Sequence, residues 1–138
     1  YIGEISSDKL TADYIPYYAE AVHAGFPSPA SDYIESPIDL NKHLIKNSSA
    51  TFLVRAQGQS MLGSGITDKA VLVVDRSIKP VHNSIVVAAI DGEFVCKRLK
   101  LKPRMCLMPD NPEYPPIFIN HGQELEIVGT VTAAINKF

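Results

Sequence analysis

Six apolar runs beyond residue 50 constrain the fold of this chain more than any other feature of its sequence. Gly, Pro, Asn and Asp residues separate these runs, which lie at residues 51–56, 70–76, 84–90, 93–101, 104–109 and 125–135. Short apolar runs bounded by such residues are typical of β-strands connected by turns. The sequence therefore predicts a mainly β fold with a compact antiparallel β body.

The N-terminal part of the chain has a different pattern. Residues 25–37 contain three prolines, which disfavour helix and remove backbone hydrogen-bond donors. A weak helical stretch precedes them and is interrupted by Pro16, whereas Asp39 is predicted to cap a short helix that leads into the β body. We therefore predict an extended N-terminal arm and linker over residues 1–38 and a β-rich domain over residues 39–138.

Composition and charge narrow the classes of function. The chain has 138 residues, of which 46% are hydrophobic and 20% charged, as is typical of a soluble globular protein. Its formal net charge of −2 argues against sequence-independent binding to nucleic acid. No apolar run approaches the roughly 20 residues that cross a bilayer, so no membrane anchor is expected. The two cysteines and the lack of a secretory leader predict a reducing, cytoplasmic location.

The run at residues 93–101 places a lysine where the alternation of a strand requires an apolar residue. The dipeptide Asp91–Gly92 comes just before it and predicts a tight β-hairpin with both residues at positive φ. Alternation then predicts that one face of the strand points inward and carries Val95, Lys97, Leu99 and Leu101. The opposite face is predicted to be solvated and carries Arg98, Lys100 and Lys102.

An inward-facing Lys97 has two interpretations. Burial disfavours the charged ammonium, so a buried lysine readily loses its proton and becomes a base. Alternatively, the side chain extends along the apolar surface until its head group reaches water, or it forms a buried ion pair. A reactive partner elsewhere in the sequence is needed to decide between them.

Ser60 is the candidate partner of Lys97. It lies in the segment "AQGQSMLGSGI" at residues 56–66, whose glycines allow another chain to come close. A serine hydroxyl is a good nucleophile only when a base removes its proton, and a neutral lysine supplies such a base. We therefore interpret Ser60 as a nucleophile and Lys97 as its general base, with the backbone amides of Ser60 and Gln59 as an oxyanion hole. The alternative is an ordinary turn serine.

The histidines do not suggest a competing site. No spacing typical of a catalytic triad or a zinc site relates His23, His43, His82 and His121. We therefore predict neither a metal nor a cofactor.

Three motifs make the chain similar to the self-cleaving serine-lysine peptidases of the LexA/UmuD family, and to their UmuD-like SOS mutagenesis members in particular. The motifs are "AGFPSPASDYIE" at residues 24–35, "GQSM" at residues 58–61 and "DGEFVCKRL" at residues 91–99. The resemblance covers nearly the whole chain and implies that the scissile bond joins Ala24 to Gly25. Two positions depart from the usual UmuD-like pattern, since Ala24 replaces a frequent cysteine and Gln59 replaces an acidic residue.

The resemblance also implies a biological role and partners. Self-cleavage would be stimulated by a RecA filament on single-stranded DNA, and the cleaved product would act as a homodimer in the bacterial cytoplasm. The dimer would then serve as accessory subunit of a Y-family translesion polymerase, alongside a UmuC-like catalytic subunit. We expect no direct sequence-specific DNA binding, because the roughly 24 residues before the cut are too few for a helix-turn-helix.

Three alternatives remain at the level of the sequence. In the first, the arm docks on the β body of a non-enzymatic interaction module that regulates a polymerase or another DNA-repair partner. In the second, the same serine-lysine pair belongs to a signal-peptidase-like enzyme, although that role requires a membrane anchor. In the third, Cys96 is the nucleophile, but alternation places Cys96 on the strand face opposite to Lys97.

Overall fold

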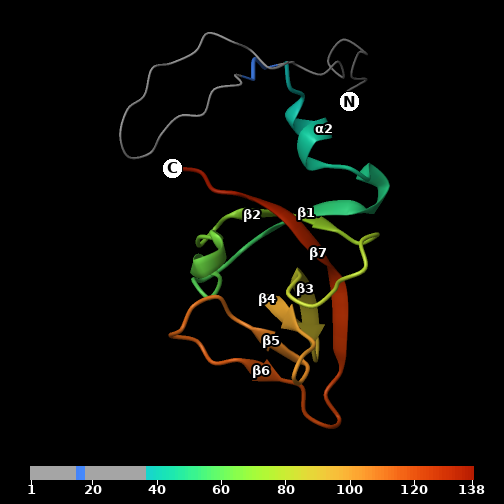
Figure 1. Cartoon of the computed structure of the whole chain (residues 1–138), viewed down its shortest axis with the longest axis vertical. Helices are drawn as coiled ribbons and strands as arrows, with labels where there is room; N and C mark the ends of the chain where they lie inside the picture. Colours follow the sequence, from blue (N-terminus) through green and yellow to red (C-terminus); the bar gives the residue numbers. More distant parts are fainter. Residues whose placement is uncertain (1–14, 18–36) are drawn as a thin grey trace. The chain divides into compact units, whose positions relative to one another are not determined.

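The structure, a computed structural model, describes residues 15–17 and 37–138 (Figure 1). The chain divides into two compact units, Tyr1–Lys46 and Asn47–Phe138. The boundary after residue 38 that we infer from the sequence stays a prediction.

The described part of the first unit contains one short helix, α2 (Leu40–Leu44). The Asp39 carboxylate accepts hydrogen bonds from the backbone N–H groups of Asn41, at 3.0 Å, and Lys42, at 3.5 Å. These bonds satisfy two of the donors that the first turn of a helix leaves free, so the predicted N-cap is confirmed.

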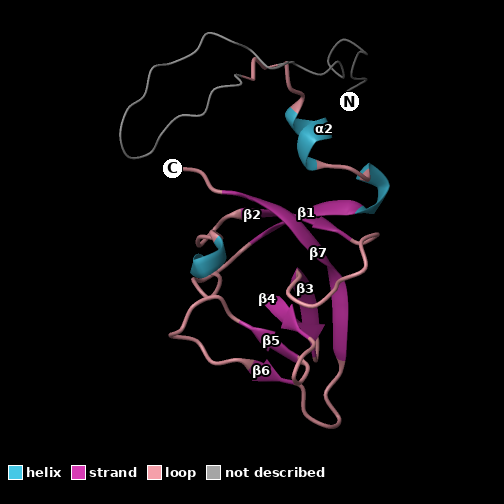
Figure 2. Ribbon diagram, viewed as in Figure 1, coloured by secondary structure: helices cyan, strands magenta, loops and turns pink. Residues whose placement is uncertain are grey.

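The second unit is a seven-stranded sheet in which every neighbouring pair of strands is antiparallel (Figure 2). Two 3₁₀ turns accompany it, η1 (Ser48–Ala50) and η2 (Leu62–Ser64). The strands are β1 (Thr51–Arg55), β2 (Val71–Asp75), β3 (Ile85–Ile90), β4 (Glu93–Lys100), β5 (Cys106–Met108), β6 (Ile117–Phe118) and β7 (Leu125–Ile135). Their order across the sheet is β1-β2-β7-β3-β4-β5-β6. The predicted mainly β, antiparallel fold is confirmed.

The six predicted strands all form, and one further strand was missed. β6 has only two residues and follows two prolines, so it is too short to show any periodicity in the sequence. The predicted hairpin is confirmed, since Asp91 has φ 49° and Gly92 has φ 88° between β3 and β4. This tight turn sets the register that pairs Lys97 of β4 with Val86 of β3.

The longest strand, β7, joins the two halves of the sheet. Its C-terminal half pairs with β2 and its N-terminal half with β3, and Thr130 pairs with a residue of each. Gly129 lies at this crossing, where an added Cβ atom would come within 2.6 Å of a methyl carbon of Val74. The absence of a side chain at residue 129 therefore lets β2 pack closely against β7.

Two buried clusters fill the space around the sheet. The first comprises Met61, Ile66, Ala70, Leu72, Val74 and Val87. The second comprises Val86, Ala88, Leu99 and Leu107. Because Val86 and Val87 are adjacent on β3, the two clusters lie on opposite faces of that strand. The Ser60 turn is thus anchored next to the first cluster by its neighbour Met61, which is 3% exposed.

The predicted faces of β4 need two corrections. Leu101 was expected to point inward, but it follows the end of β4 and its side chain is 44% exposed. Arg98 was expected on a solvated face, but its side chain is only 26% exposed and pairs with Asp110. Both errors have one physical cause, since alternation describes a single strand in isolation. It does not show where the strand ends, and it does not show which other segments of the chain cover its faces.

Candidate active site

Ser60 lies in the turn that links β1 to η2. The turn begins at Gly58, whose φ of 89° favours a residue without a side chain. The Gly58 N–H donates to the Asp68 carboxylate at 2.7 Å, which ties the start of the turn to the segment before β2. Ser60 itself is half-buried, and the next residue is anchored in the core. The hydroxyl therefore stands on a turn whose two sides are fixed.

Lys97 lies in the middle of β4, where its side chain is half-buried. Its Nζ atom donates to Ser60 Oγ at 2.7 Å and to the backbone carbonyl of Cys96 at 3.3 Å. The structure therefore brings together two predicted site residues that are 37 positions apart in the sequence. A distance of 2.7 Å is short enough for direct proton transfer between the two groups.

The surroundings of Lys97 favour its neutral form. Burial lowers the pKa of the Lys97 ammonium, and the negative charge of the Cys96 thiolate, when present, opposes that effect only in part. A lysine with a lowered pKa is uncharged, and so able to accept a proton, in a larger fraction of molecules at a given pH.

Cys96 is a poor candidate for the nucleophile. Burial raises the pKa of its thiol to about 11, although the Lys97 charge lowers it and the Asp110 charge raises it further. The thiolate is the reactive form of cysteine, so a thiol with this pKa is unreactive near neutral pH. The cysteine-peptidase alternative is therefore disfavoured.

Ser60 and Lys97 lie in the wall of a pocket of about 330 Å³. Its lining comes from strands β1 to β4 and the Ser60 turn, and most of its side chains are apolar apart from Arg55, Gln57 and the two reactive groups. The pocket is lined by Val54, Arg55, Ala56, Gln57, Gly58, Ser60, Met61, Ile66, Leu72, Val87, Phe94, Val95, Cys96 and Lys97. A concave, apolar surface with few polar groups is typical of a site that holds a side chain or small ligand next to reactive atoms.

The backbone amides proposed for the oxyanion hole are available as donors. Within the described residues, the N–H groups of Ser60 and Gln59 have no hydrogen-bond acceptor. The carbonyl of Gln59, in contrast, accepts from Asn111 Nδ2 at 2.8 Å and from the Leu62 N–H at 3.3 Å. An amide donor without an internal partner can stabilise developing negative charge on a substrate oxygen.

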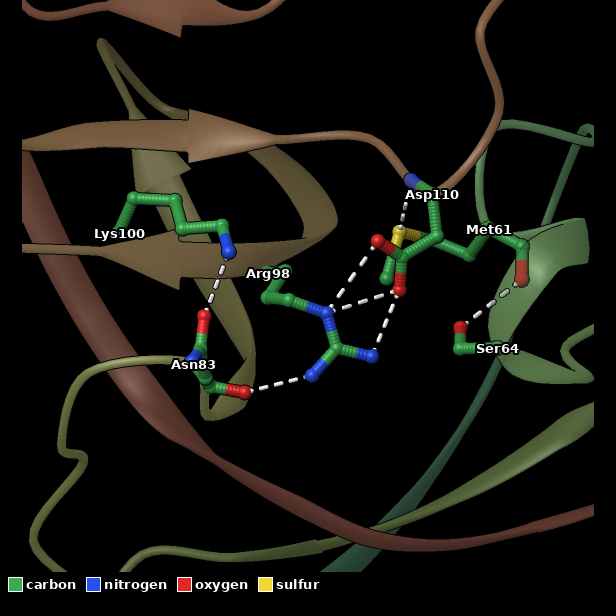
Figure 3. A network of polar contacts seen from close by, with 6 residues as sticks. All are labelled: Met61, Ser64, Asn83, Arg98, Lys100 and Asp110. Atoms are coloured by element: carbon green, nitrogen blue, oxygen red, sulfur yellow. Dashed lines mark hydrogen bonds and ion pairs between the residues drawn. The ribbon is translucent and has the colours of Figure 1, made fainter.

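A polar network ties the Ser60 turn to β4 (Figure 3). The Arg98 guanidinium pairs with the Asp110 carboxylate, with Nη2 to Oδ2 at 2.7 Å and Nε to the same oxygen at 2.9 Å. The backbone of Asp110 then contacts the turn twice, because its carbonyl accepts from the Gly63 N–H at 2.6 Å and its N–H donates to Met61 Sδ at 3.4 Å. Figure 3 shows the Asp110 segment bridging Arg98 and Met61.

The sequence does not predict this network. In the sequence, Arg98 belongs to a basic strand face, and Asp110 and Asn111 belong to no recognisable motif. The only signal available in the sequence is the turn-like stretch "PDNP" at residues 109–112, which does not reveal what it contacts. Gly63 allows this close approach because it has no side chain, since an added Cβ atom would lie 2.6 Å from the Asp110 carbonyl oxygen.

Comparison with known proteins identifies the family. Residues 16–132 match the family described as "Peptidase S24-like". The chain belongs to this family. Together with the similarity to SamA, MucA and ImpA, this match confirms the prediction of a UmuD-like member of the LexA/UmuD self-cleaving serine peptidases.

SamA and MucA match this Peptidase S24-like chain over most of their length, whereas a LexA repressor matches over little more than half of its own. It is 49% identical to Protein SamA of Salmonella typhimurium over 122 residues, which are 88% of this chain and 85% of SamA. It is 46% identical to Protein MucA of Escherichia coli, with 94% of this chain and 90% of MucA covered. Identity to LexA repressor 1 of Geobacter sulfurreducens is 32%, over 82% of this chain and 56% of the repressor.

Other sequence-based expectations have different outcomes. Ala24 and Gly25, the predicted scissile pair, lie outside the described residues, as does His23. His82 has a structural contact, because its Nδ1 accepts from the Leu101 N–H at 2.9 Å.

Among residues 15–17 and 37–138, no group of three potential metal ligands comes together. None of the helices in that part of the chain has the length and hydropathy needed to span a bilayer.

Proposed function

We propose that this Peptidase S24-like chain cleaves itself between Ala24 and Gly25, with Ser60 as nucleophile and Lys97 as general base. The observation that carries the proposal is the 2.7 Å contact between Lys97 Nζ and Ser60 Oγ in the wall of the pocket. The lowered pKa of Lys97 supports its role, since the base must be neutral when it accepts the serine proton.

The proposed reaction has two stages. In the first, Lys97 takes the Ser60 proton while Oγ attacks the Ala24 carbonyl carbon, and the amides of Ser60 and Gln59 hold the oxyanion. The bond to the Gly25 nitrogen then breaks, and that nitrogen takes the proton from Lys97. In the second stage, Lys97 takes a proton from water while the water oxygen attacks the ester carbonyl carbon of Ala24. The bond to Ser60 Oγ then breaks, Oγ takes the proton back from Lys97, and the N-terminal fragment leaves with a free carboxyl group.

The proposed biological role follows from the family. The chain would act in SOS mutagenesis, where a RecA filament on single-stranded DNA stimulates its cleavage in the bacterial cytoplasm. The shortened product would form a homodimer and join a Y-family polymerase with a UmuC-like catalytic subunit. Similarity to SamA and MucA over most of the chain supports this role. The peptidase then acts as a switch, because each molecule cuts its arm once.

Incubation of the full chain with and without RecA, single-stranded DNA and a nucleotide tests the proposal. We expect intact mass spectrometry to detect two fragments. They should form faster when the filament is present, and without the filament they should form faster at alkaline pH than at neutral pH. A chain that stays intact under both conditions would favour the alternative of a non-enzymatic interaction module.

A further inference from the structure

Asn111 contacts the peptide group that carries the proposed oxyanion donor. Its Nδ2 donates to the Gln59 carbonyl at 2.8 Å, and its Oδ1 accepts from the Glu113 N–H at 3.0 Å. The second bond fixes the orientation of the amide side chain, so that its NH₂ group faces Gln59. The two residues joined by the first bond are 52 positions apart in the sequence.

The planarity of the peptide bond links the Asn111 contact to the orientation of the Ser60 N–H. The Gln59 carbonyl and the Ser60 N–H belong to one planar trans unit, in which they point in opposite directions. A donor that holds the carbonyl on one side therefore determines where the N–H points on the other. The Ser60 N–H has no acceptor within the described residues, so its direction there depends on the two donors to the Gln59 carbonyl, Asn111 Nδ2 at 2.8 Å and the Leu62 N–H at 3.3 Å.

The position of Asn111 is itself fixed. The preceding residue, Asp110, is held by the Arg98 guanidinium, and its N–H donates to Met61 Sδ (Figure 3). Its carbonyl accepts from the N–H of Gly63 in η2. Arg98 directly follows Lys97 on β4. The segment at residues 110–111 thus links the strand that carries the base to both sides of the serine.

We infer that Asn111 is a positioning residue, which aims the Ser60 N–H at the oxyanion by holding the Gln59 carbonyl. Asn111 contacts neither reacting atom and acts only through this peptide group. The inference rests on the proposed function, because it concerns the same self-cleavage reaction. It adds a residue that neither the motifs nor the spacing of the reactive groups indicates.

The test replaces Asn111 with serine in the full chain. A serine hydroxyl can still accept from the Glu113 N–H, but it is too short to reach the Gln59 carbonyl. Asn120→Ser is the matched control, because the Asn120 side chain forms no hydrogen bond within the described residues. First-order rates of self-cleavage are measured from pH 7 to 10 for both variants and the unaltered chain.

We expect Asn111→Ser to lower the plateau rate about ten- to one-hundredfold, with the same pH midpoint. Complete loss of an oxyanion donor lowers rates by about 10²–10³-fold, and Leu62 still holds the Gln59 carbonyl in the variant. Asn120→Ser should cleave at the normal rate. A rate within twofold of normal for Asn111→Ser would overturn the inference. So would a raised midpoint, which indicates that the substitution acts by exposing Lys97 to water.

Two further measurements keep the test decisive. An alkyl fluorophosphonate, which loses fluoride as Ser60 Oγ bonds to phosphorus, should label Asn111→Ser more slowly by a similar factor without any need for arm docking. If Asn111→Ser fails to fold by circular dichroism, Asn111→Asp replaces it, since Asp keeps the size and the Glu113 bond but loses the donor. Absence of cleavage in the unaltered chain would contradict the proposed function, whereas normal phosphonylation of the variant would contradict only this inference.

Discussion

The reactivity of single residues in this chain depends on partners that are distant in the sequence. Lys97 and Ser60 meet at 2.7 Å, and neither side chain is reactive in the proposed way without the other. Burial lowers the pKa of Lys97 but raises that of Cys96, the residue beside it. Burial disfavours the charged form of each side chain, which is the protonated form of lysine and the deprotonated form of cysteine. It therefore favours the neutral lysine that can act as a base, and the neutral thiol that is a poor nucleophile.

The first prediction concerns the two reactive residues. Ser60→Ala and Lys97→Ala should each abolish self-cleavage, and the double variant should be no slower than either, since the residues act as one unit. Intact mass spectrometry after prolonged incubation measures the cleaved fraction. Cys96→Ala is the control and should retain most of the cleavage rate. Continued cleavage at Ala24 without Ser60 would rule out the mechanism.

The second prediction concerns pH. The reaction requires neutral Lys97, so the rate should rise about tenfold per pH unit below the Lys97 pKa and level off above it. Because burial lowers that pKa, the midpoint of the profile should lie below about 10.4, the ordinary lysine value. Cleavage rates of the unaltered chain from pH 6 to 10 give the profile, with circular dichroism as the check on folding. A profile that is flat over this range would exclude lysine as the base.

At the level of whole elements, the arrangement of β7 determines how closely the two halves of the sheet approach. β7 pairs with β2 and β3 in turn, and register shifts occur on both sides. Gly129 lies between these shifts and packs against Val74, which is fully buried. The pocket depends on this packing, because β1 and β2 supply Val54 and Leu72 to its wall while β3 and β4 supply Val87 and Lys97.

The third prediction concerns this contact. Gly129→Ala should lower the free energy of unfolding by about 1–3 kcal/mol, since its Cβ would lie 2.6 Å from a Val74 methyl carbon. Val74→Ala should cost about 2 kcal/mol through the lost methyl groups. In the double variant the smaller side chain makes room for the new one. The free energy of unfolding of the double variant should therefore fall by about 1 kcal/mol less than the sum of the decreases in the two single variants. Urea titrations of all four proteins measure the coupling, and strict additivity would show that the two sites do not compete for space.

At the level of the whole molecule, the arm is both part of the chain and the proposed substrate. The candidate active site is built entirely from residues of the unit Asn47–Phe138. The proposed scissile pair belongs to the other unit and lies outside the described residues. Changes near Ala24 should therefore alter cleavage without altering the stability of the β body.

The fourth prediction concerns the cut. Intact masses should correspond to fragments 1–24 and 25–138, and Gly25→Val should block their formation, because a β-branched side chain hinders close approach to Ser60. Ala30→Val, which also adds a β-branched residue to the arm, should cleave normally. The melting temperature of each variant should equal that of the unaltered chain. Fragments with other masses would refute the assignment of the scissile bond.

The sequence alone determined the features that depend on neighbours along the chain. Apolar runs bounded by turn residues predicted six of the seven strands, Asp91–Gly92 predicted the hairpin, and Asp39 predicted the helix cap. Alternation also assigned Lys97 to the strand face that carries Val95 and Leu99. Each of these follows from local backbone preference or from a period of two residues, so a single stretch of sequence contains the information. The glycine-rich segment at residues 56–66 and the need of a serine nucleophile for a base suggested Ser60 as the partner of Lys97, and the three motifs then indicated the family.

Only the tertiary structure decided which distant groups touch. The Arg98–Asp110 ion pair and the bond from Asn111 to Gln59 depend on how the segment after β5 folds back over the Ser60 turn. No period or turn preference encodes such contacts, because they arise when the whole sheet packs and buried polar groups must find partners. For the same reason alternation assigned Arg98 to solvent, although Asp110 covers it. Tertiary packing therefore decided the surroundings of the active site, while local sequence patterns decided the elements that carry it.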